Sequence, residues 1–308
     1  MNQAAIDLGT NTCLLLVRDA HGKVLHDEST VVRLGEGVAA SGMLKDEAMK
    51  RAHDCIQRYA GIAAGLGVSP DRIVAVGTAQ ARDARNARMF FSRVDAECGV
   101  KFRILSGDEE ARATFLGALL PEMSSKRAVV MDIGGGSTEL VAMPEGSKGI
   151  FGTSLGIGAV RISELFLSSN PVTDTEFWAA EDAIDRELSK LGAWRSELEG
   201  KIPGEPAFVA VAGTAVTLAM LQSGNPAYDR NLLDGFTLRK GDVHRLVEEL
   251  KWRTIEERAA MPGMEPKRAD VMLAGALIFW RVMEVLRFSS VQISTRGLRY
   301  GVLDPSFG

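Results

Sequence analysis

The sequence predicts an α/β protein made of two duplicated domains, each with a mixed sheet flanked by helices. The first observation is the stretch 129–141, where an apolar, β-branched run is followed by Asp132, three glycines and a second apolar run. The second is that the stretch 4–17 has the same order, with Asp7 in the place of Asp132. A repeat spaced this widely indicates duplicated domains rather than a solenoid of short units.

Each stretch predicts a buried strand, a glycine turn and a second strand. Glycines add no side chain to the core, so they indicate close backbone approach to a ligand and φ > 0. A row of exposed N–H groups binds anions, and a strand-end aspartate is placed to hold the accompanying cation. A plain β-hairpin is the alternative for either stretch alone. The residues that we expect to bind phosphate here are Gly9, Thr10, Asn11, Thr12, Gly134, Gly135, Gly136 and Ser137.

Composition excludes several classes of protein. The chain has 308 residues, 46% hydrophobic and 25% charged, with a net charge of −4, so no basic surface for nucleic acid is expected. The three cysteines have no metal-ligand spacing, which favours a reduced cytoplasmic setting. A strand begins almost at Met1, leaving no room for a signal peptide. The apolar run 272–288 is broken by charges and predicts a core helix, not a membrane span.

The remaining elements of the first domain alternate between strands and helices. β-Branched apolar runs predict the strands, and apolar residues at helical spacing predict the helices. In order, we expect strand 23–33, helix 46–66 ended by Gly67, strand 72–77, helix 86–97 and strand 100–105. This order is typical of an α/β domain with a mixed sheet.

The helix that starts near Ser106 carries two adjacent glutamates with different explanations. Ser106 and Glu109 fit a capping box, in which each side chain satisfies an amide at the helix start. Glu110 has no such structural role and would share a face with small residues, which would let it point into an open cleft. A solvated surface glutamate is the alternative. The small face is Ala113, Thr114 and Gly117, and the expected core stripe is Phe115, Leu116 and Leu119.

The second domain is expected to open near Lys126 with the glycine hairpin. The expected elements are a flexible link at 153–161, helix 173–191 continuing toward Leu198, loop 203–206, strand 207–211, helix 215–221, helices 240–251 and 268–288, and strand 291–294. We expect 295–301 to return to domain one. The predicted domains are therefore 1–122 plus about 289–308, and 123–288, with the active site in the cleft between them.

A third anion loop follows strand 207–211. Gly213 and Thr214 lie between this strand and a helix, and a helix N-terminus after a glycine turn binds anions. An ordinary tight connection is the alternative. The three loops, together with Arg82 after a strand, would neutralise phosphate oxygens, although a strand-end arginine by itself is more often a surface residue.

The carboxylates complete a set suited to phosphate chemistry. A divalent cation on Asp132, with Asp7 and Glu139, would offset developing charge, and Glu110 would activate the attacking oxygen. The four histidines lie outside these loops, which argues against phosphohistidine or Ser-His-Asp mechanisms. There is no cysteine followed by arginine in a phosphate loop and no Walker motif, so those phosphatase and nucleotidase classes are excluded.

The two hairpins resemble those of the actin-like (ribonuclease H-like) superfamily of sugar kinases, chaperone ATPases and acetate kinases. Within it, the chain resembles a short, two-domain member of the exopolyphosphatase/guanosine pentaphosphate phosphohydrolase (Ppx/GppA) family. The segments that carry this resemblance are 6–12, 77–82, 106–112, 132–139, 213–214, 266–270 and 297–299.

The resemblance implies an activity and a role for each site residue. Glu110 would be the base that activates water, Asp132 and Glu139 would hold Mg²⁺ or Mn²⁺, and Asn11, Arg82 and the glycine loops would bind phosphate. Water would then attack the terminal phosphorus of polyphosphate or of the alarmone pppGpp and release orthophosphate. The family also implies a homodimer, with no nucleic-acid or membrane partner.

Three departures from the family pattern stand out. Ala212 replaces a frequent glycine, Tyr300 stands where an acid is frequent, and the chain stops at Gly308 without the C-terminal helical domains of long members. The last departure favours a short-chain or nucleotide substrate. Two alternatives stay open: an actin-like small-molecule kinase, in which Glu110 would face an acceptor hydroxyl, and a nucleotide-dependent sensor or assembly protein.

Overall fold

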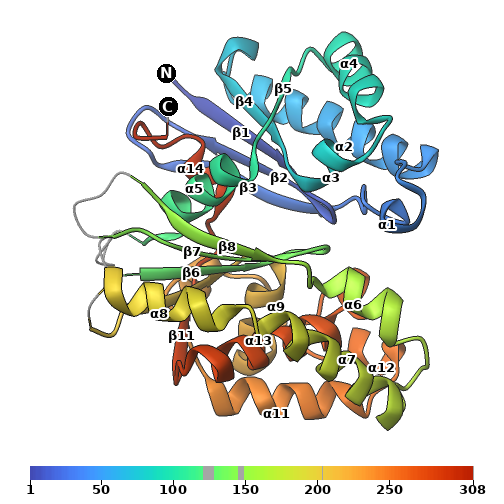
Figure 1. The fold of residues 1–308 in the computed structure, drawn as a ribbon. Helices are drawn as coiled ribbons and strands as arrows, with labels where there is room; N and C mark the ends of the chain where they lie inside the picture. The colour runs from blue at the N-terminus through green and yellow to red at the C-terminus, as the bar shows by residue number, and fades with distance from the viewer. Residues whose placement is uncertain (121–127, 145–148, 203, 308) are drawn as a thin grey trace. The chain divides into compact units, whose positions relative to one another are not determined.

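The computed structural model describes residues 1–120, 128–144, 149–202 and 204–307, and the chain forms two compact units (Figure 1). Unit 1 comprises Met1–Gly117 and Leu298–Gly308, and unit 2 comprises Ala118–Gly297. Each unit is built around one mixed sheet flanked by helices, as the sequence predicts. The expected boundary at 122/123 and the expected start near Lys126 lie outside the described residues, as does Pro203 of the predicted loop.

The sheet of unit 1 has the strand order β3-β2-β1-β4-β5. β1 pairs antiparallel with β2 and parallel with β4, β2 pairs antiparallel with β3, and β4 pairs parallel with β5. Its strands are β1 (Gln3–Leu8), β2 (Thr12–Arg18), β3 (Val24–Val31), β4 (Ile73–Gly77) and β5 (Phe102–Ile104). Its helices are α1 (Val38–Ser41), α2 (Asp46–Gly65), α3 (Ala79–Asp83), α4 (Ala87–Cys98), α5 (Gly107–Ala118) and α14 (Leu298–Gly301), with a 3₁₀ turn at Pro70–Arg72.

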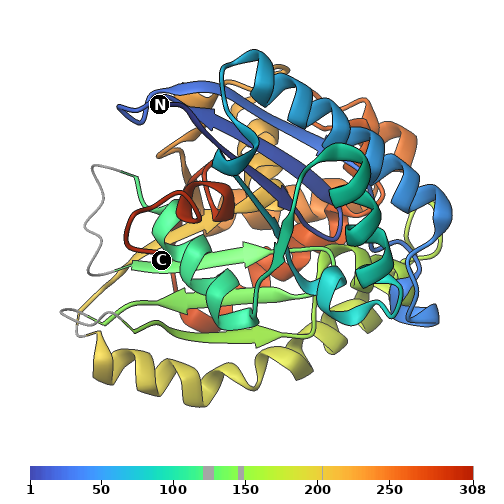
Figure 2. The same cartoon turned by 90° about the horizontal axis from the view of Figure 1, so that it is seen from above.

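Helices cover both faces of this sheet because successive strand side chains point to opposite sides. Ala4 and Ile6 enter the hydrophobic cluster formed with α2 and α4, and Figure 2 shows α2 crossing over the strands. Ala5 and Leu16 enter the cluster that includes Ala113 of α5 and residues of α14. Asp7 follows the alternation of Ala5, so its side chain belongs to the face covered by α5 and α14.

The sheet of unit 2 has the order β10-β11-β9-β6-β7-β8. Its strands are β6 (Ala128–Ile133), β7 (Thr138–Ala142), β8 (Phe151–Leu155), β9 (Ala207–Val211), β10 (Thr237–Arg239) and β11 (Ser290–Ile293). β6 pairs antiparallel with β7 and parallel with β9, β7 pairs antiparallel with β8, and β9 pairs parallel with β11. The order β8-β7-β6-β9-β11 repeats that of β3-β2-β1-β4-β5, so the duplication read from two short stretches extends to the topology of the sheets.

One hydrophobic cluster joins one face of this sheet to its helices. Met131 and Ile133 of β6 enter it, whereas Asp132 alternates to the other face. The helices are α6 (Ala159–Phe166), α7 (Asp174–Leu188), α8 (Leu191–Lys201), α9 (Ala212–Ser223), α10 (Arg230–Leu233), α11 (Lys240–Lys251), α12 (Ile255–Ala259) and α13 (Met272–Leu286), with a 3₁₀ turn at Pro266–Arg268. Most of α13 is buried, which confirms the predicted core helix. Over the described residues, no helix is long and apolar enough to cross a membrane.

Two sequence-based expectations are corrected by the strand pairing. The expected flexible link at 153–161 is wrong in its first part, because Thr153–Leu155 belongs to β8 and pairs with β7. β11 pairs with β9 and β10 of unit 2, so the boundary near residue 289 is too early and the chain enters unit 1 at Leu298. The first error arises because a short edge strand is recognised by its partner more than by its own residues. In the second, the strand itself was expected, but the unit that it joins is decided by partner strands far away in the sequence.

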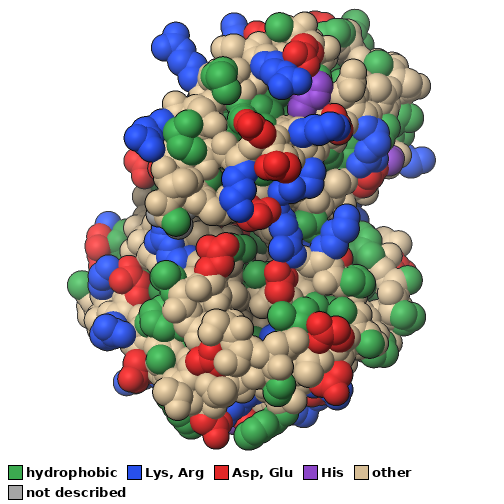
Figure 3. Space-filling model, turned by 90° about the vertical axis from the view of Figure 1, so that its right-hand side faces the viewer, with side chains coloured by type: hydrophobic (Ala, Val, Ile, Leu, Met, Phe, Trp, Pro, Cys, Tyr) green, Lys and Arg blue, Asp and Glu red, His purple; other side chains and the backbone are tan. Residues whose placement is uncertain are grey.

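Basic and acidic side chains are mixed on the surface in view in Figure 3. Lys and Arg lie among Asp and Glu there, which agrees with the small net charge. Several charged residues of the chain are paired, for example Lys45 with Glu36 at 2.9 Å and Arg51 with Glu36 at 3.1 Å. A local anion site must therefore come from backbone groups and from a few placed side chains.

Candidate active site

The first glycine turn of unit 1 is held by its own carbonyl groups. The N–H of Gly9 donates to the Thr12 carbonyl at 2.9 Å, closing the β1–β2 turn. The carbonyl oxygen of Thr10 accepts from Gly35, and that of Asn11 accepts from Val32 and Arg33, all at 2.9 Å. Within the described residues, the N–H groups of Thr10 and Asn11 donate no hydrogen bond. The turn thus fixes its carbonyls by protein contacts and leaves two adjacent donors for an anion.

Asp7 lies at the end of β1 with only 7% of its surface exposed. Burial, and after it the negative charge of Glu110, raise the pKa of Asp7 from 3.8 to about 7, although the positive charge of Arg299 opposes the shift. A carboxylate so placed is costly to ionise without a cation. Asp7 therefore fits the predicted role of a ligand for a divalent cation.

Glu110 of α5 is held by a residue of α3, the short helix that follows β4. Nη1 of Arg82 donates to Oε2 of Glu110 at 2.7 Å and to the Leu105 carbonyl at 2.8 Å. Burial raises the pKa of Glu110, while the hydrogen bonds from Arg82 and then Thr78 act to lower it. The Glu110 side chain is 22% exposed, so it is neither fully solvated on the surface nor fully buried. Among the described residues Asp7, Glu110 and Arg82 thus form one interacting group in unit 1.

The neighbouring Glu109 has the structural role that the sequence predicts. The Ser106 N–H donates to Glu109 Oε2 at 2.8 Å, and the Glu109 N–H donates to Ser106 Oγ at 3.2 Å, which confirms the capping box. These hydrogen bonds, with a close contact from Arg103, lower the pKa of Glu109.

Ala113, one of the small residues on α5, packs against α14. A Cβ at Gly301 would lie 1.7 Å from the Ala113 carbonyl oxygen, so α5 and α14 approach closely there.

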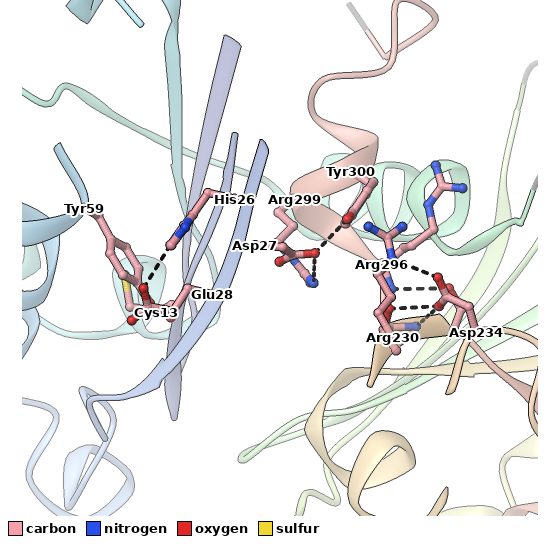
Figure 4. Close-up of polar contacts among 12 residues, drawn as sticks. Cys13, His26, Asp27, Glu28, Tyr59, Arg230, Asp234, Arg296, Arg299 and Tyr300 are labelled. Atoms are coloured by element: carbon pink, nitrogen blue, oxygen red, sulfur yellow. Dashed lines mark hydrogen bonds and ion pairs between the residues drawn. The ribbon is translucent and has the colours of Figure 1, made fainter. Parts of the chain in front are cut away.

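α14 forms a charged network with Asp27 of β3 (Figure 4). Arg299 is 6% exposed and donates to both carboxylate oxygens of Asp27 at 2.9 and 3.1 Å. The Tyr300 hydroxyl donates to the same carboxylate at 2.7 Å. Tyr300, which departs from the family pattern, therefore shares the carboxylate of Asp27 in β3 with Arg299. The network fixes the arginine whose charge opposes the rise in the pKa of Asp7.

The second glycine turn, in unit 2, rests on the start of α6. The carbonyl of Gly134 accepts from Ala159 at 2.9 Å, and that of Gly135 accepts from Val160 at 2.9 Å and Arg161 at 3.0 Å. A Cβ on Gly158 would lie 2.5 Å from Gly135. Within the described residues the N–H groups of Gly135 and Gly136 donate no hydrogen bond. The first N–H groups of α6, which have no partner within the helix, thus donate to carbonyl groups of the turn.

The backbone conformation of the turn glycines differs from our expectation. None of Gly9, Gly134 and Gly136 has φ between +20° and +160°, so the expectation of φ > 0 is wrong for these three. The close approach of α6 to the turn instead requires a glycine at position 158, where a Cβ would collide with the backbone of Gly135 and Gly136.

Two carboxylates stand opposite each other across the second hairpin. Asp132 of β6 pairs directly with Glu139 of β7, and Glu139 pairs with Ser154 of β8. Like charges in this position repel and favour a bound cation. No group of three potential metal ligands forms within the described residues. Two carboxylate oxygens still fit Mg²⁺, which keeps several waters and takes further oxygens from substrate phosphates.

The third loop lies where β9 enters α9. Ala212 has φ 67°, a left-handed conformation that a non-glycine residue rarely adopts, which gives the physical reason why glycine is frequent at this position. The Thr214 hydroxyl donates to the Ile133 carbonyl at 3.4 Å, so it anchors the loop to β6. A Cβ on Gly213 would lie 2.1 Å from Nη1 of Arg268, whose Nε donates to Glu265 at 2.8 Å. An arginine thus covers the amide end of α9.

The sequence analysis placed most of these residues but missed three contacts. Arg268 was noted only for its resemblance to the family, although the structure puts its guanidinium on the Gly213 loop. Thr78, which bonds Glu110, had no sequence signal beyond its place after Gly77. Ser154 was assigned to a flexible link. It would have been found by extending the repeat by one strand, because Ser29 stands at the equivalent place in the first copy.

Comparison with known proteins identifies the family of this chain. A model of the Ppx/GppA phosphatase family matches residues 15–307. The chain belongs to the Ppx/GppA phosphatase family. It is 34% identical over 300 residues to exopolyphosphatase 2 of Mycobacterium tuberculosis, covering 92% of this chain and 90% of that protein.

Solved structures of Ppx/GppA proteins have the same fold. The Aquifex aeolicus member of the family is 30% identical, with a TM-score of 0.79 over 98% of this chain and 96% of that one. An exopolyphosphatase from Cytophaga hutchinsonii is 26% identical, with a TM-score of 0.86 over 98% of this chain and 96% of that one. The two-domain actin-like fold expected from the hairpins is therefore confirmed.

Proposed function

We propose that this Ppx/GppA protein is a Mg²⁺-dependent phosphohydrolase that releases orthophosphate from the end of inorganic polyphosphate, with Glu110 as the base. The observation that carries the proposal is the environment of Glu110. Arg82 and Thr78 orient it, burial raises its pKa, and part of its side chain stays open. A general base works best with a pKa near the working pH, and a raised glutamate meets that condition.

The other residues supply positive charge and cation binding. The free amides of the Thr10–Asn11 and Gly135–Gly136 turns and of the α9 start would bind non-bridging phosphate oxygens. The unit 2 carboxylates Asp132 and Glu139 would hold Mg²⁺, which offsets charge on the leaving phosphate when bound. Asp7 would be ionised when cation and phosphate are present. Glu110 would take a proton from the attacking water as the terminal phosphoanhydride breaks.

Polyphosphate is the leading substrate because two of the relatives compared above are named exopolyphosphatases. The guanosine alarmone pppGpp ends in the same kind of phosphoanhydride, so it belongs in the same test. A kinase would instead transfer the phosphate to an acceptor hydroxyl.

The experiment is orthophosphate release from short polyphosphate, long polyphosphate, pppGpp and ATP, measured side by side with and without Mg²⁺. We expect Mg²⁺-dependent release from polyphosphate without an added acceptor. Absence of release from all four substrates, or release that depends on an added acceptor alcohol, would contradict the proposal.

A further inference from the structure

A row of three oxygen-bearing side chains crosses three neighbouring strands of the unit 2 sheet. Asp132 on β6 stands opposite Glu139 on β7, which stands opposite Ser154 on β8. Ser154 Oγ donates a hydrogen bond to Glu139 Oε1 at 2.9 Å. Residues paired in this way share one face of a sheet, on strands about 4.8 Å apart. Glu139 is therefore flanked by a second carboxylate on one side and by a hydroxyl donor on the other.

The hydroxyl has a physical effect on the glutamate. A glutamate side chain has three rotatable bonds, so ordering it for a ligand costs conformational entropy. A hydrogen bond from an O–H group to an ionised carboxylate is short and strong, and it selects one orientation. Carboxylates that ligate metals are commonly held by such a second contact. The contact from Ser154 thus limits the orientations that the Glu139 carboxylate can take.

The first copy of the repeat has the serine but lacks the glutamate. Ser29 of β3 pairs with Leu14 of β2, and Leu14 pairs with Asp7 of β1. Ser29 and Ser154 therefore occupy equivalent places, but only Ser154 faces a carboxylate. This difference separates the two possible reasons for a serine there. A role in strand pairing applies to both copies, whereas a role in orienting a carboxylate applies to Ser154 alone.

We propose that Ser154 is a positioning residue that orients Glu139 for a divalent cation held with Asp132. This inference rests on the proposed function through the assignment of Glu139 as a cation ligand. It adds a residue from β8, a strand that the sequence analysis did not recognise.

The test is direct binding of Mn²⁺ to the full chain, followed by the electron paramagnetic resonance signal of free Mn²⁺ as protein is added. Ser154→Ala and Ser154→Val remove the hydroxyl, and Ser154→Thr keeps it on a side chain suited to an exposed strand position. We expect the first two to weaken Mn²⁺ binding about 10-fold. We expect Ser154→Thr to stay within about 2-fold of the parent protein, since the contact that matters is retained. Ser29→Ala is the matched control and should leave binding unchanged.

The outcomes separate this inference from the function on which it rests. Glu139→Gln should abolish Mn²⁺ binding. If it binds Mn²⁺ normally, the cation assignment in the proposed function fails. If Glu139→Gln loses binding while Ser154→Ala retains it, only the role of Ser154 is overturned. A lower melting temperature of Ser154→Ala with unchanged Mn²⁺ binding would show a structural role in the edge strand and would likewise overturn it.

Discussion

The two glycine hairpins have the same antiparallel strand pairing, but they differ in the residue that pairs with the aspartate. In unit 1, Asp7 pairs with Leu14, whereas in unit 2, Asp132 pairs with Glu139. The first hairpin thus has a single, deeply buried carboxylate beside Glu110, and the second has two facing carboxylates with a serine beyond. One copy is suited to acid–base chemistry and the other to holding a cation.

The hairpins also differ in what holds their turns. The first turn uses its carbonyls to accept amides from residues 32–35, and the second uses them to accept the first amides of α6. In both cases the carbonyls are occupied and adjacent N–H groups donate to no described residue. Both copies of the repeat therefore present adjacent backbone N–H groups at the turn, whereas the side chains around the turn differ between the copies.

The largest expected effect concerns Glu110 of unit 1, the proposed base. Glu110→Gln keeps the shape of the side chain but cannot accept a proton, so turnover should fall by roughly 10²–10⁴-fold with little change in KM. Glu109→Gln is the control, because a glutamine serves a capping box equally well. Initial rates of orthophosphate release measure both. Equal loss in the two variants would show that the adjacent glutamates do not have the separate roles assigned here.

The next largest effect is expected when the close contact between Gly158 and the second turn is broken. Gly158→Ala would put a Cβ 2.5–2.6 Å from the backbone of Gly135 and Gly136, so α6 and the turn must move apart. We expect the free energy of unfolding to fall by about 3 kcal/mol, together with loss of activity. Gly136→Ala is the control for stability, since its Cβ would meet nothing within 4 Å. Chemical denaturation of the two variants gives the answer, and equal stability would refute the packing argument.

A smaller effect tests the burial of Asp7. Its pKa in the folded protein is about 7 against 3.8 for an unburied aspartate, so ionisation destabilises the fold. The stability that protonated Asp7 contributes to the fold is fully present below about pH 4. It is lost as the pH rises toward the pKa of about 7 that Asp7 has in the folded protein. Asp7→Asn should therefore match the parent at pH 4 and exceed its stability by roughly 2–4 kcal/mol at pH 8, while losing activity.

Thermal unfolding at several pH values, without divalent cations, measures this difference. A stability difference for Asp7→Asn that does not depend on pH would argue against a raised pKa. Added Mg²⁺ should reduce the difference in stability between Asp7→Asn and the parent protein, because it stabilises the parent.

The smallest effect concerns the loop at the start of α9. Ala212 has φ 67°, where a Cβ is strained by about 1 kcal/mol or more, while glycine costs extra entropy in the unfolded chain. Ala212→Gly should therefore raise the free energy of unfolding by about 0.5 kcal/mol. Differential scanning calorimetry can detect this as a small increase in Tm. A decrease in Tm would show that the backbone is not strained in the protein.

Local signals in the sequence were sufficient for a large part of the fold and site. The capping box of Ser106 and Glu109 involves residues three apart, so it is visible in the chain and left Glu110 as the glutamate to explain. The apolar pattern of α13 likewise predicts a core helix from consecutive residues. Contacts between distant residues were not visible. Arg299 binds Asp27 across 272 positions, and Arg82 binds Glu110 across 28.

The sequence by itself determined the duplication, the two aspartate hairpins and the separation of Glu109 from Glu110, because these depend on residue type and short spacing. Only the tertiary structure decided that Thr153–Leu155 forms a strand, that Ser154 meets Glu139 and that Arg268 covers Gly213. The physical reason is that such contacts are set by strand pairing and helix packing between distant segments. Their energy comes from partners that no short stretch of the chain contains.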